Sequence, residues 1–201
     1  MLARPRRTWH PDGYYHVVMR GNNRQKIFPG TRDVKEYYRI LTYVFEKYYF
    51  EIYAFCIMTN HNHLLLRSHE APLGKLMAIL NKRYSDYFRK KYNYTGQIYE
   101  NRYFSKEINN PIRQLNASAY IHRNPIETKV PIVKAMEDYP HSSYQYYFHN
   151  TKPPFPFLNL QYLPSLLPHE AHNNKKAYTQ YCINYDPKED STKHLEPWIV
   201  D

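Results

Sequence analysis

Apolar residues recur along the first half of the chain with two periods, one typical of strands and one typical of helices. Residues 14–20 predict a strand that ends at the turn-prone run Gly21-Asn22-Asn23. After Gly30, apolar positions spaced by three and four predict a helix of about four turns. Residues 51–58 and 61–67 predict two further strands, and their short connection predicts an antiparallel hairpin.

The same patterns continue to residue 125. Pro72 can open a second helix whose apolar positions run to Phe88, and this helix is predicted to break at residues 93–96. A strand is predicted at 102–108, followed by a third helix with Asn110 as N-cap. Pro125 should end this helix, because the residue before a proline is pushed out of the α region. The apolar stripe expected to dock on the sheet consists of Ile112, Leu115 and Ala119.

The order strand, helix, strand, strand, helix, strand predicts an α+β fold, a ferredoxin-like sandwich with a central antiparallel sheet and one added helix. From about residue 138 the composition changes to Pro, His, Tyr and Asn with little periodicity. We therefore divide the chain into a main domain, residues 10–137, and an accessory C-terminal extension, residues 138–201. The extension is expected to be partly helical at 163–181 and loose at its end.

Composition narrows the class of protein. The hydrophobic content of 42% is ordinary for a folded domain, and no apolar run approaches the length of a membrane span. The start of the chain lacks the apolar segment of a signal peptide, so a cytoplasmic protein is expected. Two distant cysteines, Cys56 and Cys182, form neither a disulfide framework nor a Cys-x-x-Cys motif. A metal site would therefore use His, Asn or carboxylate ligands.

Positive charge is concentrated in one part of the chain. Residues 1–134 contain 23 Lys and Arg against 10 Asp and Glu, a net charge of +13, whereas residues 135–201 carry −3. Such an excess is typical of a protein that binds a phosphate backbone, although a merely soluble basic surface is the alternative. Aromatic residues interleave with the charge in residues 82–92, which suits unpaired bases; a tyrosine-rich core is the competing explanation for these rings.

Two histidines one residue apart provide the first candidate chemistry. Side chains alternate faces along a strand, so His61 and His63 should lie on the same face. Two imidazoles on one face form a seat for a divalent metal. The chain contains 11 histidines, so a chance pair without a ligand is the alternative.

The third helix provides a possible nucleophile. Tyr120 and Asn124 lie four residues apart and should share a face, with Asn116 and Arg113 continuing the polar stripe. The amide of Asn124 could be a third ligand, and neutral ligands would leave Mg²⁺ or Mn²⁺ its charge for polarising a phosphodiester. A tyrosine beside such a metal can form a covalent phosphotyrosine. With 23 tyrosines in the chain, Tyr120 alone would more often be structural.

These motifs resemble a known family. Asn60-His61-Asn62-His63-Leu64-Leu65-Leu66 resembles the HUH motif, and Tyr120-Ile121-His122-Arg123-Asn124-Pro125 resembles the nucleophile helix of single-tyrosine HUH transposases. The run from Tyr15 to Arg24 is similar to the start of the REP-associated tyrosine transposases within that group. The resemblance covers about residues 10 to 130 in the right order. One departure is Asn62, because the middle position of the motif is usually hydrophobic; its side chain should affect packing rather than ligation.

The resemblance implies that residues 10–137 are a catalytic domain that cleaves and rejoins single-stranded DNA with Mg²⁺ or Mn²⁺. It implies that His61, His63 and Asn124 bind the metal, and that Tyr120 attacks to leave a 5′-phosphotyrosine and a free 3′-hydroxyl. Relatives recognise imperfect palindromic hairpins and an adjacent single-stranded tetranucleotide, and they act as monomers or homodimers. Candidate DNA contacts in this chain, each of which could instead be solvated surface charge, are Arg4, Arg6, Arg7, Arg20, Asn23, Arg24, Lys82, Arg83, Arg89, Lys90 and Lys91.

Two other functions stay open on the sequence. A non-catalytic DNA-binding protein that retains the fold would explain the charge asymmetry alone. A metal-dependent hydrolase acting through water would explain the histidine pair and would not need Tyr120. Relaxases share the HUH chemistry but generally use a third histidine where this chain offers Asn124, which favours the transposase branch.

Overall fold

A computed structural model describes residues 8–187 as an α+β fold around one antiparallel sheet. The four strands are β1 (Tyr14–Arg20), β2 (Phe50–Ile57), β3 (His61–Ser68) and β4 (Phe104–Glu107). Their order in the sheet is β2-β3-β1-β4, and every neighbouring pair is antiparallel. This arrangement confirms the predicted α+β class, the antiparallel sheet and the hairpin of β2 and β3.

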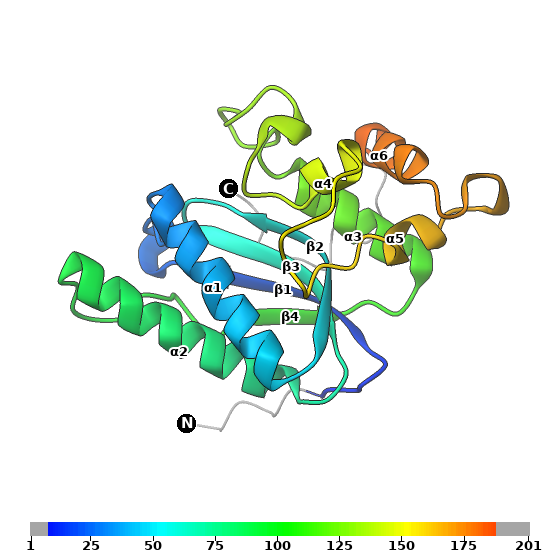
Figure 1. Cartoon of the computed structure of the whole chain (residues 1–201). Helices are drawn as coiled ribbons and strands as arrows, with labels where there is room; N and C mark the ends of the chain where they lie inside the picture. Colours follow the sequence, from blue (N-terminus) through cyan, green and yellow to red (C-terminus); the bar gives the residue numbers. More distant parts are fainter. Residues whose placement is uncertain (1–7, 188–201) are drawn as a thin grey trace.

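Two long helices cover one face of the sheet. The helices α1 (Thr31–Lys47) and α2 (Leu73–Tyr92) lie side by side on that face (Figure 1). Asn62 of β3 donates a hydrogen bond to the hydroxyl of Tyr37 in α1, so this side chain points away from the neighbouring histidines, as expected. Tyr84 and Phe88 of α2 are buried, which confirms the core explanation for these two rings of the basic segment.

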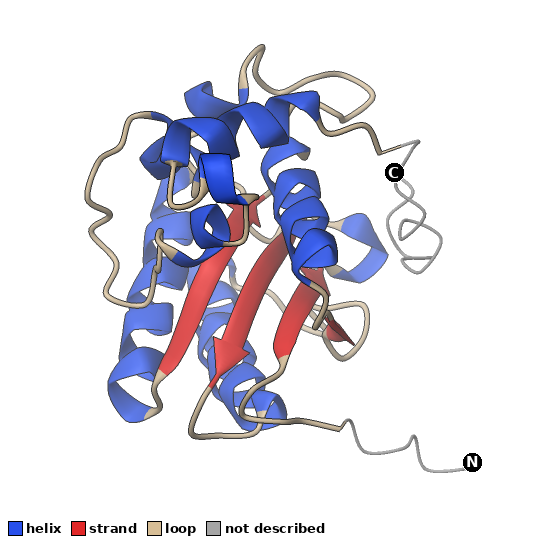
Figure 2. Cartoon of the chain, turned by 90° about the vertical axis from the view of Figure 1, so that its right-hand side faces the viewer, coloured by secondary structure: helices blue, strands red, loops and turns tan. Residues whose placement is uncertain are grey.

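The helix α3 (Pro111–Arg123) packs on the opposite face of the sheet, against β2 and β3, and Figure 2 shows helices on both sides of the strands. Asn110 caps it as predicted, with its side-chain oxygen 3.1 Å from the backbone nitrogen of Arg113. The expected docking stripe is partly wrong, because Ile112 is 65% exposed. Gln114 and Ser118 are buried instead, since the carbonyl of Ile108 and the hydroxyl of Tyr178 supply hydrogen bonds to them.

The end of α3 agrees with the expectation in one respect, because the helix stops before Pro125 as predicted, and differs in another. The helix ends at Arg123, but the backbone of Asn124, the residue before Pro125, keeps helical angles of φ −45° and ψ −44°. Its side-chain amide donates a 2.9 Å hydrogen bond to the carbonyl of Tyr120, which compensates for the crowding by the proline ring. Asn124 therefore continues the helical face that carries Tyr120.

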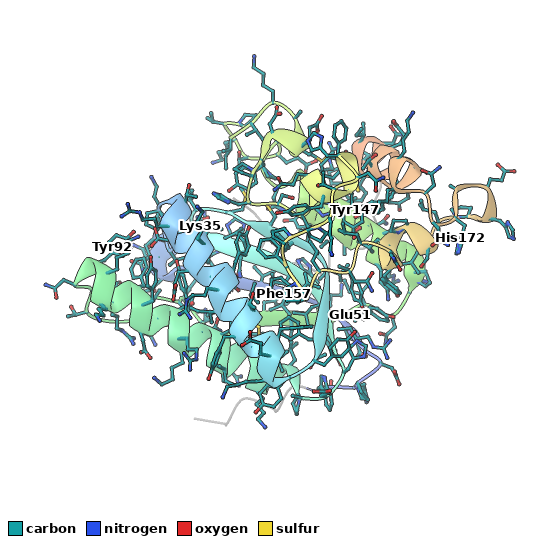
Figure 3. All side chains as sticks on the ribbon, in the orientation of Figure 1. Lys35, Glu51, Tyr92, Tyr147, Phe157 and His172 are labelled. Atoms are coloured by element: carbon teal, nitrogen blue, oxygen red, sulfur yellow. The ribbon has the colours of Figure 1, made fainter. Side chains whose placement is uncertain are left out.

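The C-terminal segment, residues 136–187, lies along the outer edge of β2 and over α3. Its short helices are η2 (Met136–Asp138), α4 (Tyr144–Phe148), α5 (Tyr162–Ser165), η3 (His169–Ala171) and α6 (Lys175–Asn184). The backbone nitrogens of Ile57 and Ile52 donate to the carbonyls of His141 and Phe157, at 2.9 and 2.7 Å. Tyr147 and Phe157 of this segment lie beside the sheet in Figure 3.

The segment is partly helical, as expected, and its hydrogen bonds satisfy an otherwise exposed strand edge. The expected loose end falls largely outside the described residues, and the division at residue 138 stays a prediction. No helix within residues 8–187 is long and apolar enough to cross a membrane.

Candidate active site

His61 and His63 lie on the face of β3 that α3 covers. His63 is completely buried and His61 is 4% exposed. Their ring centroids are 4.9 Å apart and the ring planes are nearly perpendicular, at 84°. The alternation of side chains along the strand thus brings the two imidazoles together as the sequence predicts, with Asn62 on the other face.

A third buried histidine, His16 of β1, joins this pair. Its Nε2 lies 2.9 Å from Nδ1 of His63, and the two ring centroids are 5.2 Å apart. His16 reaches this position because β1 pairs with β3 in a register that places Val18 opposite His63. Sequence analysis did not assign a role to His16, although the strand period and the strand order together place it on the same face.

The donor set of the histidine pair fits a divalent metal. Nε2 of His63 is buried and has no hydrogen-bond partner among the described residues. Burial lowers the pKa of His63 well below its ordinary value, and the neighbouring His61, His16 and Arg20 act in the same direction. The imidazole is therefore neutral at physiological pH, which is the state that binds metals. An unpaired buried nitrogen in this state is a ligand position ready for use.

Tyr120 of α3 stands against the same histidines. Its ring centroid lies 5.7 Å from that of His63 and 6.3 Å from that of His16, with the rings edge to face. Asn124 follows one helical turn later, 9% exposed, with its amide nitrogen bonded to the carbonyl of Tyr120. This bond leaves the amide oxygen as the acceptor of the side chain.

Residues 8–187 contain no cluster of three His, Cys, Asp or Glu side chains that could hold a metal. His16 does not complete such a set, because its Nε2 faces Nδ1 of His63 rather than a common centre. A third protein ligand would therefore be of another type, and the amide of Asn124 on the adjacent helix is the side chain that the sequence predicts for it.

Arg20, Asn23 and Arg24 lie at the end of the sheet where the histidines are. Arg20 is directly opposite His61 in the pairing of β1 with β3. The short helix η1 (Asn22–Arg24) follows, and Asn23 and Arg24 have positive φ angles of 49° and 55°. The backbone nitrogen of Gly21 donates to the carbonyl of Asn60 at 2.8 Å, which fixes this turn beside the start of β3.

The other predicted DNA contacts within the described residues are on α2, across the sheet from Tyr120. Lys82 pairs with Asp86 at 2.7 Å, and the guanidinium of Arg83 stacks 3.7 Å from the ring of Tyr43. Lys91 pairs with buried Asp33, which gives it a structural role. Their DNA contacts stay predictions, as do those of Arg89 and Lys90; the remaining three, Arg4, Arg6 and Arg7, lie outside the described residues.

Comparisons with known proteins bear on the fold and on the family of this chain. The family model described as "Transposase IS200 like" matches residues 10–124. A solved structure of a REP-associated tyrosine transposase bound to a REP hairpin has 19% sequence identity and a TM-score of 0.61. The alignment covers 76% of this chain and 89% of that one. Comparison with curated proteins gives no significant match.

The fold and the paired histidines beside a helical tyrosine define the class as an HUH nuclease with a single tyrosine. More particularly, the chain belongs to the family of IS200-like tyrosine transposases. Members of this family are generally metal-dependent.

Proposed function

We propose that the protein is a metal-dependent endonuclease and strand transferase that acts on single-stranded DNA through a 5′-phosphotyrosine intermediate. Residues 10–137 form the catalytic domain in this proposal, and residues 138–201 are an accessory extension. The observation that carries the proposal is the contact of the Tyr120 ring with His63, whose Nε2 is buried without a partner. A nucleophile and a metal-ligating nitrogen from different elements thus meet at one point.

His61, His63 and Asn124 would hold Mg²⁺ or Mn²⁺. When bound, the metal ion would polarise a non-bridging oxygen of the scissile phosphate and orient that phosphate. Three neutral ligands suit this task, because they leave the ion its full charge.

The covalent step belongs to Tyr120. Its phenol loses a proton, and the oxygen forms a bond to phosphorus while the bond from phosphorus to the 3′-oxygen breaks. The leaving oxygen takes up a proton and becomes a 3′-hydroxyl. Rejoining reverses the step, since an incoming 3′-hydroxyl attacks phosphorus and releases the tyrosine. No phosphodiester energy is lost to hydrolysis.

The substrate in this proposal is single-stranded DNA that carries a palindromic hairpin. The structure of the solved relative shows it bound to a REP hairpin, which supports this class of ligand. Arg20, opposite His61, and Arg24 in the following turn offer cationic groups beside the proposed phosphate site. DNA contacts of this kind weaken steeply with salt.

The test is a nicking assay with single-stranded oligonucleotides that contain palindromes from the DNA flanking the coding region. With Mn²⁺, the wild-type protein should form a covalent adduct that survives denaturing electrophoresis. Tyr120→Phe should bind the same DNA but form no adduct. Tyr49→Phe is the matched control, because this exposed tyrosine packs on His69, away from the paired histidines.

Three results would contradict the proposal. Adduct formation by Tyr120→Phe at the wild-type level would exclude the nucleophile. Binding without nicking under Mn²⁺ or Mg²⁺ across all such palindromes would support the non-catalytic alternative, and nicking without an adduct would support hydrolysis by water.

A further inference from the structure

The two histidines of the pair share an arrangement that the motif itself does not explain. Each uses Nδ1 for a hydrogen bond within the protein. Nδ1 of His61 lies 2.6 Å from the side-chain oxygen of Asn60, and Nδ1 of His63 lies 2.9 Å from Nε2 of His16. Asn60 directly precedes His61 in the chain, and His16 lies against His63 from the neighbouring strand β1. Neither Asn60 nor His16 is a predicted metal ligand.

The hydrogen bond between His61 and the side-chain oxygen of Asn60 can run in only one direction. A carbonyl oxygen accepts, so Nδ1 of His61 carries the proton and donates it. In a neutral imidazole, the other nitrogen then has a lone pair. Nε2 is therefore the atom that His61 can offer to a metal.

The bond between His16 and His63 could run in either direction. If His16 donated, Nε2 of His63 would carry a hydrogen, and this buried donor has no acceptor among the described residues. In the metal-free protein either direction leaves this buried Nε2 unpaired, as a donor or as an acceptor, at a cost of about 1–3 kcal/mol. If His63 donates from Nδ1, its Nε2 has a lone pair instead, which a metal ion can satisfy.

We propose that His16 is a positioning residue that accepts a hydrogen bond from Nδ1 of His63 and thereby holds Nε2 of His63 as the metal-binding atom. Asn60 does the same for His61. The inference rests on the proposed function only in taking His63 as a metal ligand. Outer partners of this kind fix the orientation and tautomer of ligating histidines.

Two observations fit this role better than packing alone. His16 and His63 are both completely buried, so water cannot substitute for either partner. The ring of His16 also lies edge to face with Tyr120, at 6.3 Å between centroids, so His16 contacts ligand and proposed nucleophile together. An apolar residue at position 16 could fill the space but could not accept the hydrogen bond.

The first test reads the tautomer directly, in the metal-free protein and without DNA. Two-bond nitrogen–proton NMR correlations of histidine-labelled protein distinguish imidazoles protonated at Nδ1 from those protonated at Nε2. His63 is expected to be protonated at Nδ1 in the wild type. A wild-type His63 protonated at Nε2 would overturn the inference, whether or not the enzyme cleaves DNA.

The second test measures the affinity for Mn²⁺ alone by electron paramagnetic resonance. His16→Phe should weaken Mn²⁺ binding about 10- to 100-fold, as loss of an outer-shell partner typically does. His16→Gln should recover most of this affinity, because its amide oxygen can accept from Nδ1. His69→Phe is the control, since His69 bonds Glu51 and lies against Tyr49, not against the paired histidines.

Measurements on His16→Phe and His16→Gln also distinguish failure of the proposed role of His16 from failure of the proposed function. Equal Mn²⁺ affinity of His16→Phe and the wild type would refute the role of His16 while leaving the proposed function intact. Absence of Mn²⁺ binding by the folded wild type would refute the metal site and, with it, this inference. If His16→Phe fails to fold, His16→Gln and the wild-type tautomer decide: weak binding by a folded Gln variant would contradict the acceptor role.

Discussion

Asn62, between the two paired histidines, is a packing residue of the opposite face. It donates a hydrogen bond to the buried hydroxyl of Tyr37 in α1. Asn62→Leu should therefore leave Mn²⁺ affinity unchanged but lower the free energy of unfolding by about 1–3 kcal/mol, because the Tyr37 hydroxyl loses its partner. Urea denaturation and Mn²⁺ titration of the same preparation measure both quantities.

A double variant provides the control for this prediction. Adding Tyr37→Phe to Asn62→Leu removes the orphaned hydroxyl and should restore much of the lost stability. A loss of Mn²⁺ affinity in Asn62→Leu with unchanged stability would instead mean that position 62 acts on the metal site.

Arg20 is the predicted DNA contact that lies nearest to the candidate site in the sheet, opposite His61. Arg20→Gln should weaken binding of single-stranded DNA and lower the slope of log K against log salt by about 0.7 to 1, the share of one phosphate contact. Arg39→Gln is the matched control, because Arg39 is exposed on α1 and pairs with Glu36. An unchanged slope in Arg20→Gln would assign Arg20 a structural role.

At this scale, local spacing predicts the histidine pair and the shared face of Tyr120 and Asn124, because both follow from backbone periodicity. His16 is different. Its role depends on the pairing of β1 with β3, a contact between residues 47 positions apart. Strand order could have suggested the position, but no local pattern distinguishes His16 from a core histidine.

Among the elements, α3 is held by a hydrogen-bond network that reaches into the C-terminal segment. His122 lies two residues after Tyr120 and is completely buried. Its Nε2 is 2.8 Å from the hydroxyl of Ser143, and its Nδ1 is 3.2 Å from the hydroxyl of Tyr178. Tyr178 of α6 also donates to Ser118 at 2.8 Å. The helix that carries Tyr120 is thus fixed by Ser143, the N-cap residue of α4, and by α6.

Tyr178→Phe should loosen this helix. The variant leaves Ser118 and His122 without the shared hydroxyl, at a cost of about 1–3 kcal/mol. Amide hydrogen exchange of residues 111–124 should become faster, while exchange in β1 and β3 should change little.

Tyr146→Phe serves as the comparison variant, because Tyr146 of α4 packs edge-on against Phe155, with centroids 6.1 Å apart, rather than in this network. Equal exchange rates in the two variants would show that the network does not hold α3.

The sequence predicts the elements well where apolar periodicity is strong. The boundaries of β2, β3 and α2 agree with the expected ones within a residue or two, because one face of each element is buried. The errors lie on α3, where Ile112 is exposed and Gln114 is buried. The partners that allow Gln114 to be buried, Tyr162 and the carbonyl of Ile108, come from the tertiary structure.

At the scale of the whole molecule, buried residues of the C-terminal segment belong to the same hydrophobic core as those of the sheet. Cys56 in β2 and Cys182 in α6 are both completely buried, and burial raises the pKa of the Cys182 thiol to about 12. Since the thiolate is the reactive form, both thiols should be unreactive toward Ellman's reagent in the native protein. In increasing urea they should become reactive over the same concentration range.

Coincident exposure would mean that sheet and C-terminal segment unfold together, as their shared hydrogen bonds along β2 predict. Exposure of Cys182 well before Cys56 would contradict this and would support an extension that unfolds separately from residues 10–137. Single-cysteine variants, Cys56→Ala and Cys182→Ala, assign each reactive phase.

The sequence shows that positive charge is concentrated in residues 1–134, but only the fold shows on which side of the sheet each cation lies. Arg20 and Arg24 lie at the histidine end of the sheet, whereas the cations of α2 lie across the sheet from α3. Net charge predicts a polyanionic partner but does not predict which cations face it. Lys91 and Lys82, for example, form ion pairs within the protein, with Asp33 and Asp86 respectively. The path of the DNA therefore could not be predicted from the sequence.

The central claim is that Tyr120 becomes covalently joined to DNA, and peptide mapping of the trapped adduct tests it most directly. Trypsin releases residues 114–123, in which Tyr120 is the one tyrosine. After nuclease trimming, this peptide should carry the nucleotide mass, and a 3′-end label on the oligonucleotide should stay with the protein. An adduct on another peptide, or retention of a 5′-end label instead, would contradict the account.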